Sequence, residues 1–571
     1  MLRRMPGVQL VTSYRRRWLV KDLVAGFVLT AVLVPQGMAY AELAGLPAIT
    51  GLYASTACLV AYALFGPSRV LVLGPDSSLG PMIAATILPL AGGDDPARAV
   101  ALASMLALMV GGIMVAAAVG RLGFIVDLIS KPTMIGYLNG LALTILVGQL
   151  PKLLGFTVDA DGLVGEFTGF VRGVATGQVV AAAAVVGLGG TAVILALGRW
   201  APKVPAVLLM VVLAIIAVSV FDLAAHGVSL VGELPKGFPP FTIPHIRVAD
   251  IWPLLIGAVS IAVVSLADTI STASAFAART GQQVRGNKEM AGIGAADLAT
   301  GLFQGFPVST SGSRTAVAHQ AGARTQLTGL VGAVLILLMI VLVPGLFRNL
   351  PQPALAAVVI TASLSLFDVA GSVRLWRQRK AEFLLSVAAF LGVALLGVLP
   401  GIGIAVGLSI LNVFRRAWWP HQTVLGRVSG LAGFHDTHSY PDAEHLPGAL
   451  IYRFDAPLFF ANANSFRAEI TRLARTEPAP RWIVIAAEPI TDVDTTAADV
   501  LARLDEALNA QGTSLVFAGL KDPVRRKLQR YGLTHTIDPG HFFPTAEAAI
   551  AAFQAETGAQ WVSAAPASPT G

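Results

Sequence analysis

The sequence has little charge for its length. Of its 571 residues only 13% are charged and 55% are hydrophobic, and its mean hydropathy is +0.71. Soluble globular chains carry about 25% charged residues, so the composition excludes an ordinary soluble protein and indicates a membrane protein. The chain has one cysteine, Cys58, which excludes an intramolecular disulfide. Because Cys58 lies in an apolar run, we interpret it as core filler.

Long apolar segments fill the first three quarters of the chain. A membrane-spanning helix needs about 20 such residues. Fourteen spans are predicted, of which the third and tenth are short, at 22–44, 48–65, 77–91, 97–119, 124–148, 178–198, 204–222, 251–277, 288–305, 313–322, 326–346, 353–372, 381–397 and 400–414.

The net charge of +7 does not indicate a nucleic-acid partner, because the basic residues gather at the ends of the spans. Connections after even-numbered spans hold most of them, including Arg69, Arg199 and Arg285. The positive-inside rule therefore places these connections and both termini in the cytoplasm. We expect a multi-pass protein of the cell (inner) membrane, in contact with lipid.

The last 130 or so residues are different, because their apolar runs have strand length and alternate with helical patterns, as in "RWIVIAAE" followed by "TAADVLARLDEALNAQG". This alternation predicts a small α/β domain. The predicted organisation is a cytoplasmic N-terminal segment at 1–21, a transmembrane domain at 22–416, a linker at 417–440, the α/β domain at 441–560 and a disordered tail at 561–571.

The two short spans share a pattern. The third opens with "GPDSSLGPM" and the tenth with "FPVSTSGSRTA", each a proline followed by small hydroxylated residues and a helical run. Pro75 and Pro307 are 232 residues apart, and spans one and eight have about the same offset. Transporters are often built from inverted repeats with broken helices. The pattern predicts two halves of seven spans, each with one half-helix.

A half-helix that starts inside the membrane directs unpaired N–H groups and about half a positive charge toward the interior. Two such ends facing each other form an anion site. Arg314 adds a full positive charge in the first turn of the second half-helix, and further hydroxyl donors come from Ser77, Ser78, Ser311 and Ser313. The alternative is that these serines only cap helices.

Two longer motifs carry a family resemblance. "VPQGMAYAELAGLPAITGLYAS" at 34–55 and "GNKEMAGIGAADLATGLFQGFPVSTSGSRTAV" at 286–317 resemble signatures of the sulfate permease (SulP) anion transporters, and the C-terminal domain resembles a STAS domain. The resemblance implies an all-α membrane fold of fourteen spans in a seven-plus-seven inverted repeat, like the uracil permeases. It also implies a homodimer, a cytoplasmic STAS domain and substrates such as sulfate, bicarbonate, chloride, oxalate or dicarboxylates.

The resemblance also implies a binding site drawn from spans one, three, eight and ten. Gln36 and Tyr40 match positions of span one that face the substrate, and Asp76 follows the Gly-Pro of span three. In span ten the matching block holds Ser311, Gly312, Ser313 and Arg314. In span eight Asp268 and Thr272 lie on one helix face, a spacing that resembles the sodium site of the bicarbonate-transporting members.

Asp76 is the unusual member of this set, because an ionised carboxylate repels an anion. At ~5 Å and an effective dielectric of about 20, unit charges repel by roughly 3 kcal/mol. Protonation removes this cost, so one hypothesis is proton-coupled uptake with Asp76 or Asp268 as the carrier. The alternative is a charged Asp76 that caps the half-helix. Glu42 and Asp297 are further candidates, because intramembrane acids are often functional. The alternatives are that Glu42, near the end of span one, faces water and that Asp297 makes a hydrogen bond between packed helices.

In the STAS-like domain, Thr495 and Thr496 match the loop that is phosphorylated in bacterial anti-anti-sigma relatives, and the alternative is an N-cap beside Asp494. Cytoplasmic regulators could act through this domain. We predict no enzyme activity, no metal site and no cofactor other than a coupling H+ or Na+. The predicted function is secondary active transport of a small anion, most simply sulfate, by an elevator motion of spans 1–4 and 8–11. A bicarbonate or C4-dicarboxylate transporter, an anion exchanger and a channel stay open.

Overall fold

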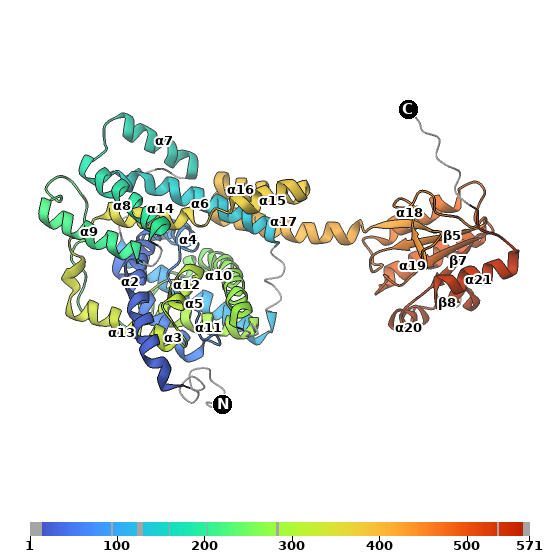
Figure 1. Ribbon diagram of the computed structural model, residues 1–571, viewed down its shortest axis with the longest axis horizontal. Helices are drawn as coiled ribbons and strands as arrows, with labels where there is room; N and C mark the ends of the chain where they lie inside the picture. The colour runs from blue at the N-terminus through green and yellow to red at the C-terminus, as the bar shows by residue number, and fades with distance from the viewer. Residues whose placement is uncertain are drawn as a thin grey trace. The chain divides into compact units, whose positions relative to one another are not determined.

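The computed structural model describes residues 14–92, 95–122, 130–158, 160, 162–201, 204–280, 285–533 and 536–562 (Figure 1). It separates into two compact units, Met1–Ile410 and Leu411–Gly571. Residues 1–13 of the predicted N-terminal segment and residues 563–571 of the predicted tail lie outside the described part of the chain.

The first unit is helical. Eight of its described helices are long and apolar enough to cross a membrane, and three shorter ones are strongly apolar. The helices are α2 (Leu19–Leu43), α3 (Ala48–Phe65), α4 (Gly80–Ala91), α5 (Pro96–Val119), α6 (Lys131–Leu153), α7 (Gly162–Ala175), α8 (Ala181–Trp200), α9 (Ala206–Phe221), α10 (Ile251–Thr280), α11 (Gly286–Leu302), α12 (Gly312–Gln320), α13 (Leu327–Leu342), α14 (Gln352–Leu364), α15 (Val369–Gln378), α16 (Lys380–Leu396) and α17 (Val398–Trp418).

Two features of this unit differ from the prediction. The segment predicted as one span at 353–372 forms α14 and the start of α15, because the Asp368 carboxylate accepts a hydrogen bond from Gly371 N at 2.7 Å and starts a new helix. The helix α7 was not predicted, because its 14 residues carry Glu166 and Arg172 among apolar ones and have no long apolar run. The expected count of fourteen spans and the inverted repeat stay predictions.

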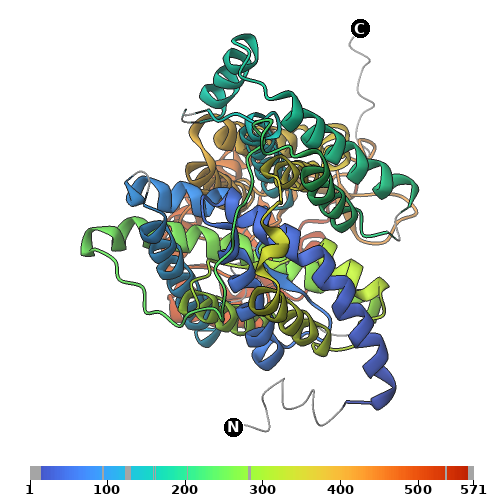
Figure 2. The ribbon, with the colours of Figure 1, turned by 90° about the vertical axis from the view of Figure 1, so that its left-hand side faces the viewer.

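Helices from the two halves of the sequence pack against each other, with α13 against α2 and α11 against both α3 and α5 (Figures 1 and 2). Small residues allow the close crossings. A Cβ atom on Gly51 would lie 1.9 Å from the carbonyl oxygen of Gly37, where α3 crosses α2. Only glycine fits there, so backbone contact between these helices fixes the position of the part of α2 that contains Gln36 and Tyr40.

Two short strands lie at the starts of the half-helices. β1 (Leu73–Gly74) pairs antiparallel with β2 (Ser309–Thr310), with Leu73 opposite Thr310 and Gly74 opposite Ser309. The half-helices α4 and α12 follow a few residues later and begin 232 residues apart. This pairing satisfies extended backbone that is buried in the unit, and it brings the starts of both half-helices to one place.

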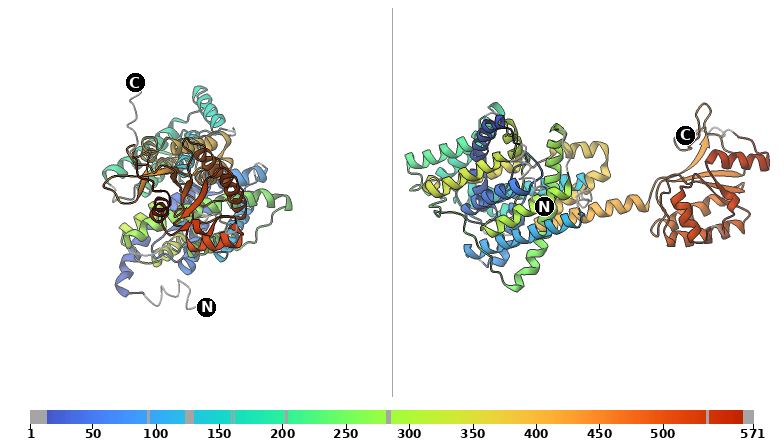
Figure 3. Two further views of the ribbon diagram at one scale, coloured as in Figure 1. Left: turned by 90° about the vertical axis from the view of Figure 1, so that its right-hand side faces the viewer. Right: turned by 90° about the horizontal axis from the view of Figure 1, so that it is seen from below.

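The second unit is an α/β domain with a sheet and flanking helices (Figure 3). Its sheet has six strands in the order β4-β3-β5-β6-β7-β8. Its strands are β3 (Gln422–Arg427), β4 (Phe434–Asp436), β5 (Ala449–Phe454), β6 (Trp482–Ala486), β7 (Ser514–Ala518) and β8 (Phe542–Phe543), and its helices are α18 (Ala463–Ala474), α19 (Thr495–Asn509), α20 (Asp522–Arg530) and α21 (Ala546–Thr557). Alternate residues of β6 enter two cores, one under α18, α19 and α20 and the other under α21.

The ends of this domain differ from the prediction. The predicted linker 417–440 contains β3 and β4, which are part of the sheet. At the other end, Val562 pairs with His445, and the Arg427 guanidinium lies 5.2 Å from the ring centre of Trp561. Residues 561 and 562 therefore belong to the folded domain. Pairing between segments far apart in the sequence decided both ends, and local composition does not show it.

Candidate functional site

A cavity of about 770 Å³ lies inside the helical unit, between two groups of helices. One wall is polar and comes from α2, α10 and the starts of α4 and α12; its residues are Gln36, Tyr40, Asp76, Ser77, Ser78, Asp268, Thr272, Thr310, Ser311, Gly312 and Ser313. The other wall is largely apolar and comes from α6, α8, α9 and α14. These residues come from four segments of the sequence, 36–40, 76–78, 268–272 and 310–313, so only the fold brings the segments together.

The start of α12 opens into this cavity. Ser311 is the N-cap, and its Oγ accepts a hydrogen bond from Arg314 N at 3.5 Å and lies 3.1 Å from Ser313 Oγ. Gly312 and Ser313 are exposed to the cavity, whereas Ser311 and Arg314 are buried. A small anion can therefore reach the N–H groups and the positive end of this helix.

Asp76 organises the turn before α4. Its Oδ1 accepts hydrogen bonds from Ser78 N at 3.0 Å and from Ser78 Oγ at 2.9 Å. Its Oδ2 lies 3.6 Å from Nη2 of Arg314, which is 1% exposed. These contacts fit the alternative in which Asp76 is charged and stabilises the helix start.

Arg314 lies differently from what the sequence suggested. It does not line the cavity. Its guanidinium reaches from α12 to the carbonyl oxygen of Pro75 and to the carboxylate of Asp76. The expectation of a cation facing the substrate is therefore corrected, because the charge of Arg314 is directed at the other half-helix. The pair joins the starts of α4 and α12 across the β1–β2 contact.

Ser78 connects two carboxylates. Besides its contact with Asp76, its Oγ lies 3.0 Å from Oδ2 of Asp268 on α10. A serine hydroxyl has one hydrogen, so it can donate fully to one of the two. The second contact is a hydrogen bond only if one carboxyl group is protonated and donates to Ser78. Asp76 also faces the Arg314 cation, so the two carboxyl groups that Ser78 contacts have different electrostatic surroundings.

The sequence reasoning missed the second wall. Thr361 of α14, Ser365 directly after this helix and Arg199 of α8 line the cavity together with apolar side chains such as Ile194 and Val358. In the sequence, Arg199 indicated only the membrane topology, as one of the basic residues in the predicted cytoplasmic connections. The hydroxyl groups of Thr361 and Ser365, four residues apart in the sequence, could have indicated a polar helix face at this site. Similar pairs occur in many helices, so they do not single out a binding site.

Other predicted residues lie elsewhere. Glu42 lines a separate cavity of about 380 Å³ with Lys152 and Glu233. Asp297 is buried, and its Oδ1 accepts a hydrogen bond from Val308 N at 2.8 Å, which holds the segment before β2.

Thr495 and Thr496 are exposed at the start of α19, where the Asp494 carboxylate, and not a threonine hydroxyl, is the N-cap. The N-cap alternative is thus corrected for both threonines. No group of three or more His, Cys, Asp or Glu side chains placed to hold a metal ion occurs among the described residues.

These observations define a multi-pass membrane protein with a polar, half-helix-bounded site for a small anion. A model of the sulfate permease family matches residues 19–389, and one of the STAS domain matches residues 440–549. The chain belongs to the sulfate permease family of anion transporters, with a C-terminal STAS domain.

The chain is similar to full-length relatives. It is 41% identical over 550 residues to a Mycobacterium tuberculosis protein named "Probable sulfate transporter", covering 96% of this chain and 98% of that one. It is 30% identical over 584 residues to sulfate transporter 1.1 of Arabidopsis thaliana, covering 97% and 89%.

Two solved structures share the fold. The murine solute carrier 26 family member A9 anion transporter matches with a TM-score of 0.88 at 22% identity, covering 96% of this chain and 94% of that one. The transmembrane domain of the cyanobacterial bicarbonate transporter BicA matches with a TM-score of 0.60 at 23% identity, covering 69% and 99%.

Proposed function

We propose that this protein is a secondary active transporter that takes up sulfate together with protons by an elevator-type motion. Membership of the sulfate permease family and the names of the relatives from Mycobacterium tuberculosis and Arabidopsis thaliana support sulfate. The observation that carries the proton coupling is the position of Ser78 Oγ, between Asp76 at 2.9 Å and Asp268 at 3.0 Å.

The charges around the cavity explain why an anion and a proton bind together. Asp76 and Arg314 compensate each other, and a protonated Asp268 is neutral. The two helix ends and the cation of Arg199 on the facing wall then leave a positive potential for the anion. If Asp268 is ionised, a dianion ~5 Å away is repelled by roughly 7 kcal/mol at an effective dielectric of about 20. Protonation of Asp268 removes this repulsion and therefore favours loading of the anion.

The difference between the two walls of the cavity supports the proposed elevator-type motion. The polar wall comes from α2, α4, α10 and α12, and the facing wall comes from α6, α8, α9 and α14. A largely apolar wall offers few fixed hydrogen bonds to the anion, so the polar wall can carry its bound anion along it. We place the protein in the cell (inner) membrane as a homodimer with both termini in the cytoplasm, in accord with the basic connections.

The test is uptake of radiolabelled sulfate into proteoliposomes that contain the full chain, with imposed pH or sodium gradients. We expect saturable uptake that an outward-alkaline gradient slows and an outward-acidic gradient accelerates. In the Asp268→Asn variant this pH dependence is lost, because asparagine keeps a hydrogen-bond donor toward Ser78 but cannot release a proton. Glu42→Gln is the matched control, since Glu42 lines another cavity, and it keeps the pH dependence.

Competing anions, ion gradients and current measurements distinguish between the possible substrates and transport mechanisms. Bicarbonate or fumarate that competes more strongly than unlabelled sulfate would replace sulfate as the substrate. Uptake driven by a sodium gradient at constant pH would mean that Na+, held at Asp268 and Thr272, is the coupling ion in place of the proton. A current that does not saturate with anion concentration would make the protein a channel, and full pH dependence in Asp268→Asn would refute the assigned carrier.

A further inference from the structure

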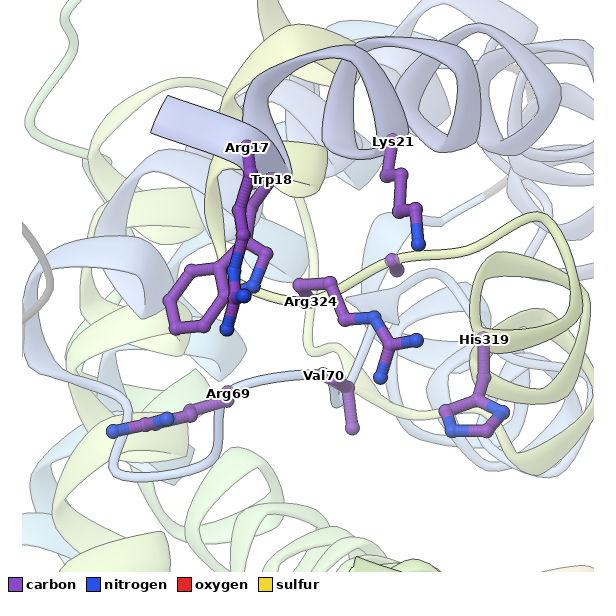
Figure 4. A pocket seen from close by; sticks show the side chains of 8 residues that line it. Arg17, Trp18, Lys21, Arg69, Val70, His319 and Arg324 are labelled. Carbon is purple, nitrogen blue, oxygen red and sulfur yellow. The ribbon is translucent and has the colours of Figure 1, made fainter. Parts of the chain in front are cut away.

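A second cavity of the helical unit, of about 570 Å³, is lined by cationic side chains (Figure 4). Arg17 and Lys21 come from the start of α2, Arg69 from the connection after α3, and His319 and Arg324 from the end of α12 and the loop after it. Trp18, Val70 and Ala323 complete the lining, so none of the described residues that line the pocket is an aspartate or glutamate.

The four permanent cations lack ion-pair partners among the described residues. Ion pairs are formed by other arginines and lysines of the protein. Residues 1–13, which precede this pocket in the chain, contain no aspartate or glutamate. Four like charges around one cavity repel each other unless an anion lies between them.

The nearest acid in the sequence does not neutralise the pocket. Asp22 is fully buried and turned toward the loop before α13, where its carboxylate accepts hydrogen bonds from Arg324 N at 2.7 Å and from Thr325 N at 3.1 Å and Oγ1 at 2.8 Å. Thr328 Oγ1 and Tyr14 OH add contacts at 3.2 and 3.3 Å. These hydrogen bonds hold the loop that carries Arg324 against the start of α2, so contacts within the fold fix two sides of the pocket relative to each other.

The pocket is separate from the candidate transport cavity. The two cavities share no lining residue. Gly312, at the first turn of α12, lines the transport cavity, whereas His319, in its last turn, lines the basic pocket about 10 Å further along the helix.

The surroundings indicate which anion fits. The helix that supplies Lys21 also exposes Val20, Val24 and Phe27, at 70%, 50% and 60%, and such an apolar face suits contact with lipid chains. Trp18, which is half-buried and lines the pocket, is of a residue type that is enriched at membrane interfaces. Basic pockets at the end of membrane helices bind phosphate-bearing lipid headgroups.

We propose that this basic pocket binds a phosphate anion, supplied by the headgroup of an anionic phospholipid whose chains lie along the exposed face of α2. Arg69 and Arg324, which both line the cavity, hold the phosphate oxygens, and Lys21 adds a third charge. Guanidinium groups bind phosphate through paired hydrogen bonds. The bound lipid ties the start of α2 to the loop after α12, two elements that also carry the candidate transport site.

The test is native mass spectrometry of the delipidated full-length protein in detergent, titrated with phosphatidylglycerol or with zwitterionic phosphatidylcholine. We expect tighter binding of phosphatidylglycerol, and roughly 100-fold weaker binding in the double variant Arg69→Gln/Arg324→Gln, which lacks two charge-assisted contacts. The matched control is Arg374→Gln/Arg377→Gln on α15, which removes two exposed arginines and leaves binding unchanged. In lipid-free detergent the Arg69/Arg324 variant has a Tm equal to or above that of the parent, because repulsion is removed.

A second arm adds inorganic phosphate and glycerol 3-phosphate in millimolar amounts. If they displace the lipid, the phosphate site is supported and its occupant is the headgroup. If they bind as tightly as the lipid, the site is supported but the lipid source is overturned. Equal losses in both double variants, equal binding of the two lipids, or a lower Tm of lipid-free Arg69→Gln/Arg324→Gln would overturn the proposal.

Discussion

Replacing Asp76 with asparagine removes the carboxylate that faces the guanidinium of Arg314. The two groups lie 3.6 Å apart, and Arg314 is 1% exposed. At this distance and an effective dielectric of about 20, their attraction is roughly 5 kcal/mol. Removal of one partner of a buried pair costs about 3–5 kcal/mol, because the other charge is left uncompensated. We therefore expect the Asp76→Asn variant to be less stable by this amount.

Asp268→Asn should behave differently. If Asp268 is protonated when it contacts Ser78, the substitution changes no charge and keeps a donor toward Ser78 Oγ, 3.0 Å away in the parent. Its effect on stability should stay below about 1 kcal/mol. The two carboxylates touch the same serine, so the contrast between the variants reports which one carries the charge.

The assay is a double-mutant cycle on the purified protein near neutral pH, with Asp76→Asn, Arg314→Gln and their combination. Thermal unfolding should give a coupling energy of about 3 kcal/mol, so the double variant is more stable than the sum of the single effects predicts. The opposite pattern, with a stable Asp76→Asn and an unstable Asp268→Asn, would refute the proton assignment and move the charge to Asp268.

Three further predictions concern packing and the STAS domain. Gly51→Ala should destabilise the helical unit by more than about 3 kcal/mol in thermal unfolding, because its Cβ meets the Gly37 carbonyl, whereas Gly112→Ala, with no atom within 4 Å of its Cβ, should be neutral. Burial raises the pKa of Asp505 to about 6, so the charged carboxylate destabilises the domain above that pH. The stability of the domain should therefore rise as the pH falls toward 4. The Asp505→Asn variant should slow hydrogen exchange of α19 several-fold at pH 7.5 and remove the pH dependence of the stability. Trp561→Ala should lower the domain's stability by about 2 kcal/mol, measured by exchange of β3 and β4, and unchanged exchange would place residue 561 outside the fold.

Much of the architecture could be predicted from local patterns. Apolar run length locates most membrane helices, and the Gly-Pro and serine clusters locate both half-helices. The prediction failed in two places, where one local helix cap and where pairing between distant strands decide the structure. A single carboxylate, Asp368, divides one predicted span into α14 and α15, and sheet pairing draws β3 and β4 out of the predicted linker. Neither effect changes hydropathy or composition enough to be seen in the sequence.

The candidate site shows the same limit. Spacing and resemblance placed Gln36, Tyr40 and Ser313 on the right elements, and these residues do line the cavity. The direction of the Arg314 side chain could not be predicted, because its partner Asp76 is 238 positions away and the β1–β2 pairing sets their distance. Once Arg314 is directed at Asp76, the two candidate proton carriers are no longer equivalent. The choice between them is therefore a property of the fold.

One proton per sulfate also predicts a charge for the transport cycle. Sulfate carries two negative charges, so the loaded site moves one net negative charge inward if Asp268 alone is protonated. Moving one charge through 100 mV changes the free energy by about 2.3 kcal/mol, equivalent to roughly 50-fold in accumulation. Proteoliposomes with an imposed inside-positive potential of ~100 mV should therefore accumulate about 50-fold more sulfate than those at zero potential, at the same pH gradient. Accumulation that does not respond to potential would mean that a second proton accompanies each sulfate, and Asp76 would then have to share the coupling with Asp268.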